Sequence, residues 1–133
     1  MKKILLPCLL ALSTLAMAQT SPMLASEYQA AKSRIEADHT TGEGRCSAMQ
    51  GNAKDVCEKE TEGQAKVARA ELEQRYEASA SNARKVTEAK ISAEYEITTQ
   101  KCDAMESAAK DACEKEAKAK RDRSRADLKS SRS

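Results

Sequence analysis

The sequence has almost no aromatic side chains: among its 133 residues there is no Phe and no Trp, and Tyr occurs three times. Aromatic side chains contribute much of the buried area of a typical core. Their scarcity therefore excludes a thick globular core. Ala, Lys and Glu are abundant instead, and all three favour helices. We expect an all-α fold of long, thinly packed, coiled-coil-like helices.

The motifs of common enzyme and cofactor sites are also missing. The chain has no C-x-x-C pair to tune a reactive thiolate, no C-x-x-C-H for haem and no Gly-rich phosphate loop. Its single histidine, His39, is expected to pack on a helix face. We therefore expect a protein that is not an enzyme and that holds no cofactor or metal. Zinc bound by four cysteines is the one metal alternative.

Long apolar runs are absent except at the N-terminus. Lys2 and Lys3 precede an apolar stretch over residues 4–15, and small residues at 16 and 18 suit a signal peptidase. This pattern predicts a signal peptide over residues 1–18, cleaved after Ala18, and a periplasmic or secreted protein. The stretch is too short to span a bilayer as a mature helix, so we do not expect a transmembrane protein.

Cleavage would change both the charge and the cysteine count. It would remove two lysines and Cys8, which leaves 21 basic residues against 21 acidic ones and four cysteines. A neutral chain gives no support for specific nucleic-acid binding. An even number of cysteines in an exported chain favours disulfides. A lipoprotein signal at Cys8 and cleavage after Ala25 are the alternatives.

One block of fifteen residues occurs nearly twice. CSAMQGNAKDVCEKE occupies 46–60 and CDAMESAAKDACEKE occupies 102–116, an offset of 56 positions. The match extends over about 50 residues on each side of a short connection, and such duplication indicates one supersecondary unit used twice. We expect two tandem antiparallel helical hairpins over 19–77 and 83–128, with a linker at 78–82 and a flexible tail at 129–133.

Small and apolar residues recur every three or four positions within each unit, as on one face of a helix. These positions are Tyr28, Ala31, Ile35, His39, Gly42, Cys46 and Met49, then Cys57, Thr61, Ala65, Ala68, Leu72 and Tyr76, and in the second unit Thr87, Ile91, Tyr95, Thr98, Cys102 and Met105.

The turns between these helical faces are predicted from Gly, Asn and Ser. Gly51 is expected to end the first helix in a left-handed conformation, and Asn52 to cap the next. In the second unit Ser107 and Ala108 replace this pair, with Ser107 as the expected cap. Two threonines and two glycines within residues 40–44 should fray or kink the first helix.

The cysteines of each block are eleven positions apart and about equally far from the expected turn. In a hairpin they would face each other, which predicts disulfides Cys46–Cys57 and Cys102–Cys113. On one continuous helix they would lie about 16 Å apart, too far to bond. Two such helices would instead pair Cys46 with Cys113 and Cys57 with Cys102. Both pairings stay open from the sequence.

One segment is strongly basic: residues 115–133 hold eight basic and three acidic side chains. Cations suit a helix C-terminus, so a solvated helix end explains the excess. A contact with an anionic envelope component, such as a lipid headgroup, is the alternative. The candidate residues for that contact are Lys118, Lys120, Arg121, Arg123 and Arg125.

The duplicated C-x10-C block, with Ala48-Met49 and Gly51-Asn52 inside it, resembles a group of small exported proteobacterial proteins rich in Ala, Lys and Glu. Some of them are labelled TolA-like, a label that reflects shared composition. The chain departs from their pattern at Thr40–Gly44 and at Ser107-Ala108. The resemblance implies no established activity or site.

These observations favour a non-enzymatic structural or interaction protein in the periplasm or outside the cell. Long charged helices with a thin apolar stripe suit packing on a partner protein or self-association. The alternative is a stress-related protein, either chaperone-like or binding anionic envelope components.

Overall fold

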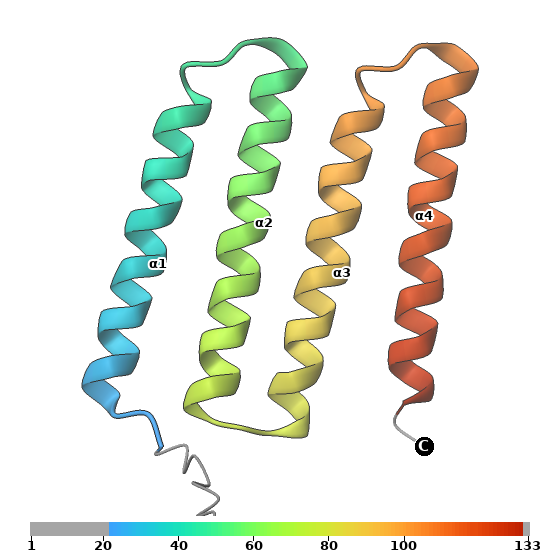
Figure 1. Ribbon diagram of the computed structural model, residues 1–133. Helices are drawn as coiled ribbons and strands as arrows, with labels where there is room; N and C mark the ends of the chain where they lie inside the picture. Colours follow the sequence, from blue (N-terminus) through green and yellow to red (C-terminus); the bar gives the residue numbers. More distant parts are fainter. Residues whose placement is uncertain (1–21, 132–133) are drawn as a thin grey trace, which may run out of the picture.

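The computed structural model describes residues 22–131. It contains four helices: α1 (Ala25–Cys46), α2 (Gly51–Tyr76), α3 (Ala80–Cys102) and α4 (Ser107–Ser130). They form two antiparallel hairpins, which confirms the all-α fold (Figure 1). The predicted signal peptide and its cleavage point after Ala18 lie outside the described residues.

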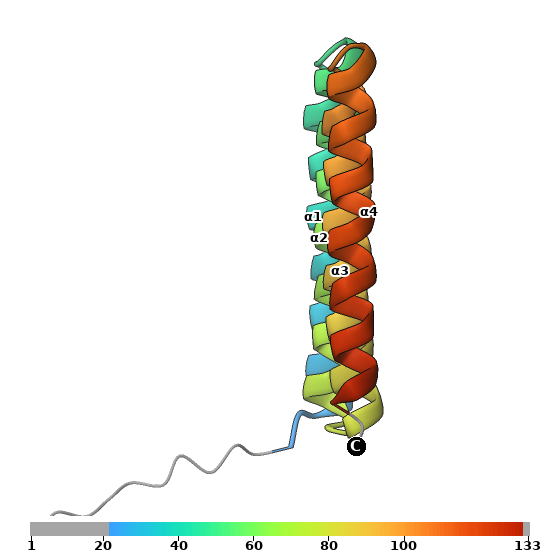
Figure 2. The same ribbon diagram turned by 90° about the vertical axis from the view of Figure 1, so that its right-hand side faces the viewer.

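The four helices lie side by side in a single layer. Figure 2, turned by 90° from Figure 1, shows them one behind another. Within residues 22–131, α1 contacts α2, α2 contacts α3 and α3 contacts α4, and no other pair of helices touches. Domains usually bury their apolar faces between two layers. Here the core is confined to the three seams between neighbouring helices.

The core is small, as the shortage of large side chains predicts. Its most buried large side chains are Leu72, Cys46 and Cys102, at 1%, 0% and 0% exposure. The other buried apolar residues are Ala65, Ile91, Ala93 and Ala117. Most of the predicted stripes thus face a neighbouring helix. The exceptions are Met49 and Met105, which lie in the turns, and Thr87, and all three are exposed. Tyr76 is 43% exposed, but its ring centre lies 4.4 Å from that of Tyr28 in α1.

The prediction for the first turn was only partly right. Gly51 does adopt a left-handed conformation, with φ of 59°. It begins α2 rather than ending α1, which stops at Cys46. Gln50, not Asn52, occupies the N-cap position. Asn52 turns away from the helix end because its Nδ2 donates to the carbonyl oxygen of Gln100 in α3, at 2.8 Å.

The second turn repeats this geometry. Ser107 begins α4 with φ of 46°, and Glu106, not Ser107, occupies the N-cap position. The expected cap was therefore wrong. A residue in the left-handed region cannot adopt the extended backbone that an N-cap residue uses.

The prediction of a frayed or kinked first helix was wrong. α1 is continuous from Ala25 to Cys46 through Gly42 and Gly44. Thr40 and Thr41 are accommodated because their hydroxyl groups donate to the carbonyl oxygens of Glu36 and Ala37, at 3.0 and 2.8 Å. Gly42 is buried against α2, where it permits a close approach to Thr61.

The linker is shorter than predicted, and the first two residues of the predicted tail are helical. α3 begins at Ala80, because Ser79 caps it: the Ser79 hydroxyl accepts from the Asn82 N–H, at 3.0 Å. The buried Asn82 side chain donates to the Glu77 carbonyl oxygen, at 2.8 Å, and closes the loop. At the other end, α4 continues to Ser130, so residues 129 and 130 are helical.

Candidate functional site

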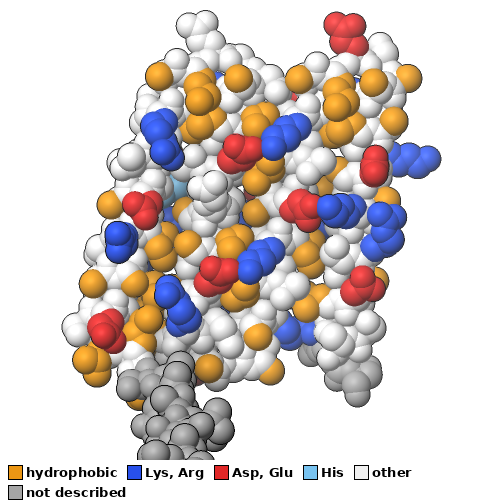
Figure 3. All heavy atoms as spheres, in the orientation of Figure 1, with side chains coloured by type: hydrophobic (Ala, Val, Ile, Leu, Met, Phe, Trp, Pro, Cys, Tyr) orange, Lys and Arg blue, Asp and Glu red, His pale blue; other side chains and the backbone are white. Residues whose placement is uncertain are grey.

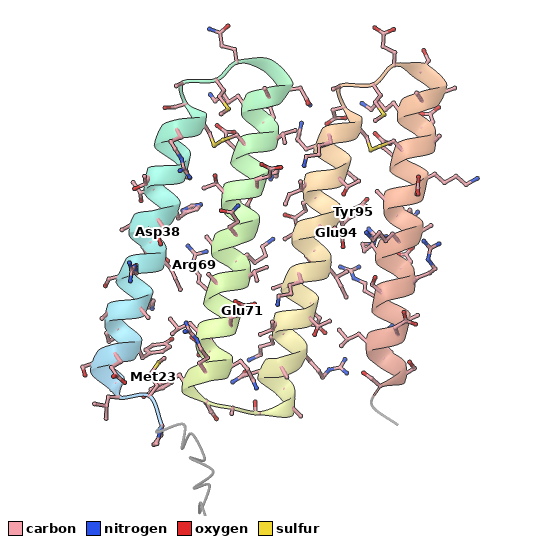
Figure 4. The ribbon with its side chains drawn as sticks, viewed as in Figure 1. Met23, Asp38, Arg69, Glu71, Glu94 and Tyr95 are labelled. Carbon is pink, nitrogen blue, oxygen red and sulfur yellow. A yellow bond between two sulfur atoms is a disulfide. The ribbon has the colours of Figure 1, made fainter. Side chains whose placement is uncertain are left out.

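The two disulfides join the helices of each hairpin at one end of the layer. Cys46 bonds to Cys57 and Cys102 bonds to Cys113, with Cα–Cα distances of 5.5 and 5.7 Å. Figure 4 shows both as yellow bonds near the turns. This confirms the local pairing and rules out the cross-repeat one. Because Cys46 and Cys102 are fully buried, the two disulfides have a structural role: each holds the two helices of its hairpin together.

The five candidate anion-binding residues of α4 do not share one face. A helix advances about 100° per residue, so 118, 120, 121, 123 and 125 point in several directions. Two of them contact α3: Lys120 forms an ion pair with Glu94, and the guanidinium of Arg121 lies 4.3 Å from the centre of the Tyr95 ring. Figure 4 shows Glu94 and Tyr95 on α3 beside α4. A hydrogen bond to Asp122 also raises the pKa of Arg121.

The remaining three, Lys118, Arg123 and Arg125, are exposed and form no ion pair with another described residue. They are the part of the predicted set that can meet an anion in solvent. Elsewhere, charges of opposite sign alternate: on the face drawn in Figure 3, blue, red and orange side chains are interspersed. That face carries no broad patch of one sign.

Ion pairs link neighbouring helices across the seams. Arg69 of α2 donates from Nε and Nη2 to the two carboxylate oxygens of Glu36 in α1, at 2.9 and 3.0 Å. This bidentate hydrogen bonding lowers the pKa of Glu36. Lys90 and Lys101 of α3 pair with Glu71 and Glu60 of α2, both at 2.7 Å. These side chains therefore contribute to the packing of neighbouring helices.

The shallow grooves of the molecule run along the seams. One lies between α3 and α4 and is lined by Ile91, Tyr95 and Arg121, and another lies between α1 and α2 and is lined by Ile35 and His39. His39 and Tyr95 are 56 positions apart, so the two grooves occupy matching places in the hairpins. His39 is partly buried between α1 and α2, and its Nε2 lies 3.7 Å from the Glu43 Oε1. This agrees with the expected packing of His39 on a helix face.

Neither metal-binding nor membrane-spanning features occur in the part of the chain that the structure describes. No three His, Cys, Asp or Glu side chains are grouped to hold a metal ion between residues 22 and 131. Over the same range no helix is long and apolar enough to cross a bilayer.

The sequence did not predict two of the contacts between helices. The first is the α2–α3 seam, where Gly63 meets Ala93. The second is the stacking of Arg121 on Tyr95. Gly63 carried a weak signal, because a glycine inside a helix costs about 1 kcal/mol relative to alanine, and close packing is one feature that can offset this cost. Arg121 carried no such signal. It stands 56 positions after Ala65, and an arginine in place of a core alanine suggests a position that has left the core.

Comparison of the chain with protein-family models, with curated proteins and with solved structures found no match.

Proposed function

We propose that this chain is a non-enzymatic structural or interaction protein that acts in the periplasm or outside the cell after removal of residues 1–18. The observation that supports this best is the single layer: among residues 22–131, no helix covers either broad face of α2 and α3. A single layer of helices has a large surface for its size and forms no enclosed cavity that could hold a reacting substrate. The duplicated block and the resemblance to exported Ala/Lys/Glu-rich proteins also support this proposal.

One broad face has a feature that suits a protein partner. A shallow apolar groove lies over the α2–α3 seam, and Val67, Ile97, Gln64 and Glu71 are among the residues that line it. Half-buried aliphatic side chains with a polar margin are typical of protein contact surfaces. The proposal therefore assigns partner binding to this face.

Site-specific photocrosslinking in the native compartment tests the assignment. A photoreactive residue at Gln64 should crosslink one defined protein. The control is Glu62, which points about 200° away on the same helix and should not crosslink it. Equal crosslinking at both positions, or none at either, would contradict the proposal. N-terminal sequencing of the same material tests export, because the expected first residue is Gln19.

Weak binding to anionic envelope components is a second candidate. The exposed Lys118 and Arg125 favour it, because they are seven positions apart and share one face of α4, and each basic residue near an anionic surface adds about 1 kcal/mol. Vesicles with anionic lipid should bind the protein more than zwitterionic ones, and salt should weaken the binding. Changing these two residues to Gln should abolish it. The control changes Lys32 and Arg75 to Gln, which removes the same charge elsewhere, and should retain binding.

A further inference from the structure

The α2–α3 seam is the contact between the last helix of one hairpin and the first helix of the next. Its backbones approach closely: a Cβ added to Gly63 would lie 3.0 Å from the Ala93 Cβ. Three ion pairs cross this seam, Glu60–Lys101 and Glu71–Lys90 at 2.7 Å and Lys66–Glu96 at 3.1 Å. The seam is thus a tight contact of small residues flanked by charges of opposite sign.

The same positions recur, 56 residues away, on the two open edges of the layer. Residues of the α2 side of the seam correspond to residues of α4, and residues of its α3 side correspond to residues of α1. Ala119 stands where α2 has Gly63, and Ala37 stands where α3 has Ala93. Both alanines are exposed, and α1 and α4 each contact a single neighbouring helix in the described chain. Each edge therefore presents the counterparts of one side of the seam, and no helix of the described chain packs against them.

The charges at these positions keep their signs. Glu116 and Asp127 of α4 correspond to Glu60 and Glu71. On the other edge, Arg45 and Arg34 of α1 correspond to Lys101 and Lys90. Two of the three ion pairs of the seam would therefore form again if α4 of one chain met α1 of another. The third would not, because Asp122 and Thr40 replace Lys66 and Glu96.

We propose that the α4 edge of one copy docks antiparallel against the α1 edge of a second copy, so that the helical layer continues from chain to chain. Such a contact uses different surfaces on its two sides, and it gives a ring if the rotation closes or an open row if it does not. The proposal names a partner for the structural role proposed above. It is tested on purified protein, so it can fail while crosslinking to another partner succeeds, and the reverse.

The contact is weaker than the internal seam. Where the seam has Val67 and Ile97, the open edges have Arg123 and Thr41, so less apolar area is buried. Charge pairs contribute a larger share of the attraction, and salt screens exposed pairs. Assembly therefore depends on protein concentration and weakens with salt.

Sedimentation of the disulfide-bonded chain at increasing concentration tests the proposal with charge-reversal variants. The wild type should assemble. Arg34→Glu/Arg45→Glu should remain monomeric under the same conditions, and so should Glu116→Lys/Asp127→Lys. An equimolar mixture of the two variants should assemble again, because each reversed edge then meets an edge of opposite sign. Lys32→Glu/Arg75→Glu, which reverses two charges away from both edges, should behave as the wild type.

The opposite results are equally defined. A wild type that stays monomeric at every concentration would overturn the proposal and identify the edges as polar caps, which repeat proteins use for solubility. A variant that still dimerises alone would overturn it in favour of a symmetric contact through its unchanged edge. Circular dichroism of each variant separates loss of assembly from loss of folding, since monomers that keep their helical signal are folded.

Discussion

At the residue scale, the most informative positions are two helix starts with a left-handed backbone. Gly51 and Ser107 begin α2 and α4 with φ of 59° and 46°. The left-handed region costs a residue with a Cβ about 1–2 kcal/mol, and glycine escapes this cost. The second hairpin therefore carries backbone strain at a place where the first does not.

Exchanging these two residues should move stability in opposite directions. Ser107→Gly should raise the free energy of unfolding by about 0.5–1 kcal/mol, because relief of strain exceeds the extra chain entropy of glycine. Gly51→Ser should lower it by a similar amount, although a Cβ there would meet no atom within 4 Å. Denaturant unfolding measures both. A stabilised Gly51→Ser protein would show that the left-handed backbone is not required.

A second pair of glycines, both in α1, separates packing from helix propensity. A Cβ at Gly42 would lie 2.5 Å from the Thr61 Cγ2, whereas one at Gly44 would meet nothing within 4 Å. Gly42→Ala should therefore lose about 1–3 kcal/mol by overpacking. Gly44→Ala should gain about 1 kcal/mol from helix propensity. Adding Thr61→Ser, which removes Cγ2, should recover part of the Gly42→Ala loss; without recovery the assigned clash is wrong.

At the scale of the elements, each hairpin is closed by its own disulfide. The bonded cysteines are eleven residues apart and join the end of one helix to the second turn of the next. Closing a loop of this length in the unfolded chain contributes roughly 3 kcal/mol on a chain-entropy estimate. Seams made of alanine, threonine and glycine contribute little apolar burial, so these bonds carry a large share of hairpin stability.

Reduction should lower the melting temperature markedly, and the cysteines should act as two separate pairs. Cys46→Ser and Cys57→Ser should each cost roughly 2–3 kcal/mol, and the double change should cost no more than either alone. Cys102 and Cys113 should behave in the same way. Losses from the two hairpins should add, because distant sites are independent. Calorimetry under oxidising and reducing conditions gives the comparison, and equal melting temperatures in both would remove the stapling role.

At the scale of the whole molecule, one seam holds the two hairpins together. Only α2 and α3 connect them within residues 22–131, through close packing at Gly63, ion pairs and the bond from Asn52 to the Gln100 carbonyl oxygen. The described part of the chain forms no second layer that could restrain the hairpins. The cooperativity of the whole fold therefore depends on this seam.

A side chain inserted into the seam should uncouple the hairpins. Gly63→Val places a branched side chain against Ala93, where a single Cβ already comes to 3.0 Å. Unfolding should change from one transition to two, while helix content at low temperature is retained. Ala119→Val, at the matching exposed position of α4, should keep a single transition in the dilute protein, with only the small loss of stability that the lower helix propensity of valine causes. A single transition in Gly63→Val would show that the hairpins do not depend on this contact.

The sequence by itself determined the helical class, the division into hairpins and, among two open possibilities, the favoured disulfide pairs. These features follow from signals local in the chain: composition, three- and four-residue spacing, and cysteines eleven positions apart. Gly51 was recognised as a left-handed residue for the same reason, but the helix it belongs to was assigned wrongly. Helix ends depend on hydrogen bonds to distant groups, such as that of Asn52 to α3.

Only the tertiary structure decided how the hairpins lie against each other. The stripes identify the seams within each hairpin and say nothing of the α2–α3 seam, which is built from small and charged residues such as Gly63, Ala93 and Glu71. Such residues look the same in sequence whether they face solvent or a neighbouring backbone. Their role is fixed by which helices meet, and that depends on long-range packing that no local pattern encodes.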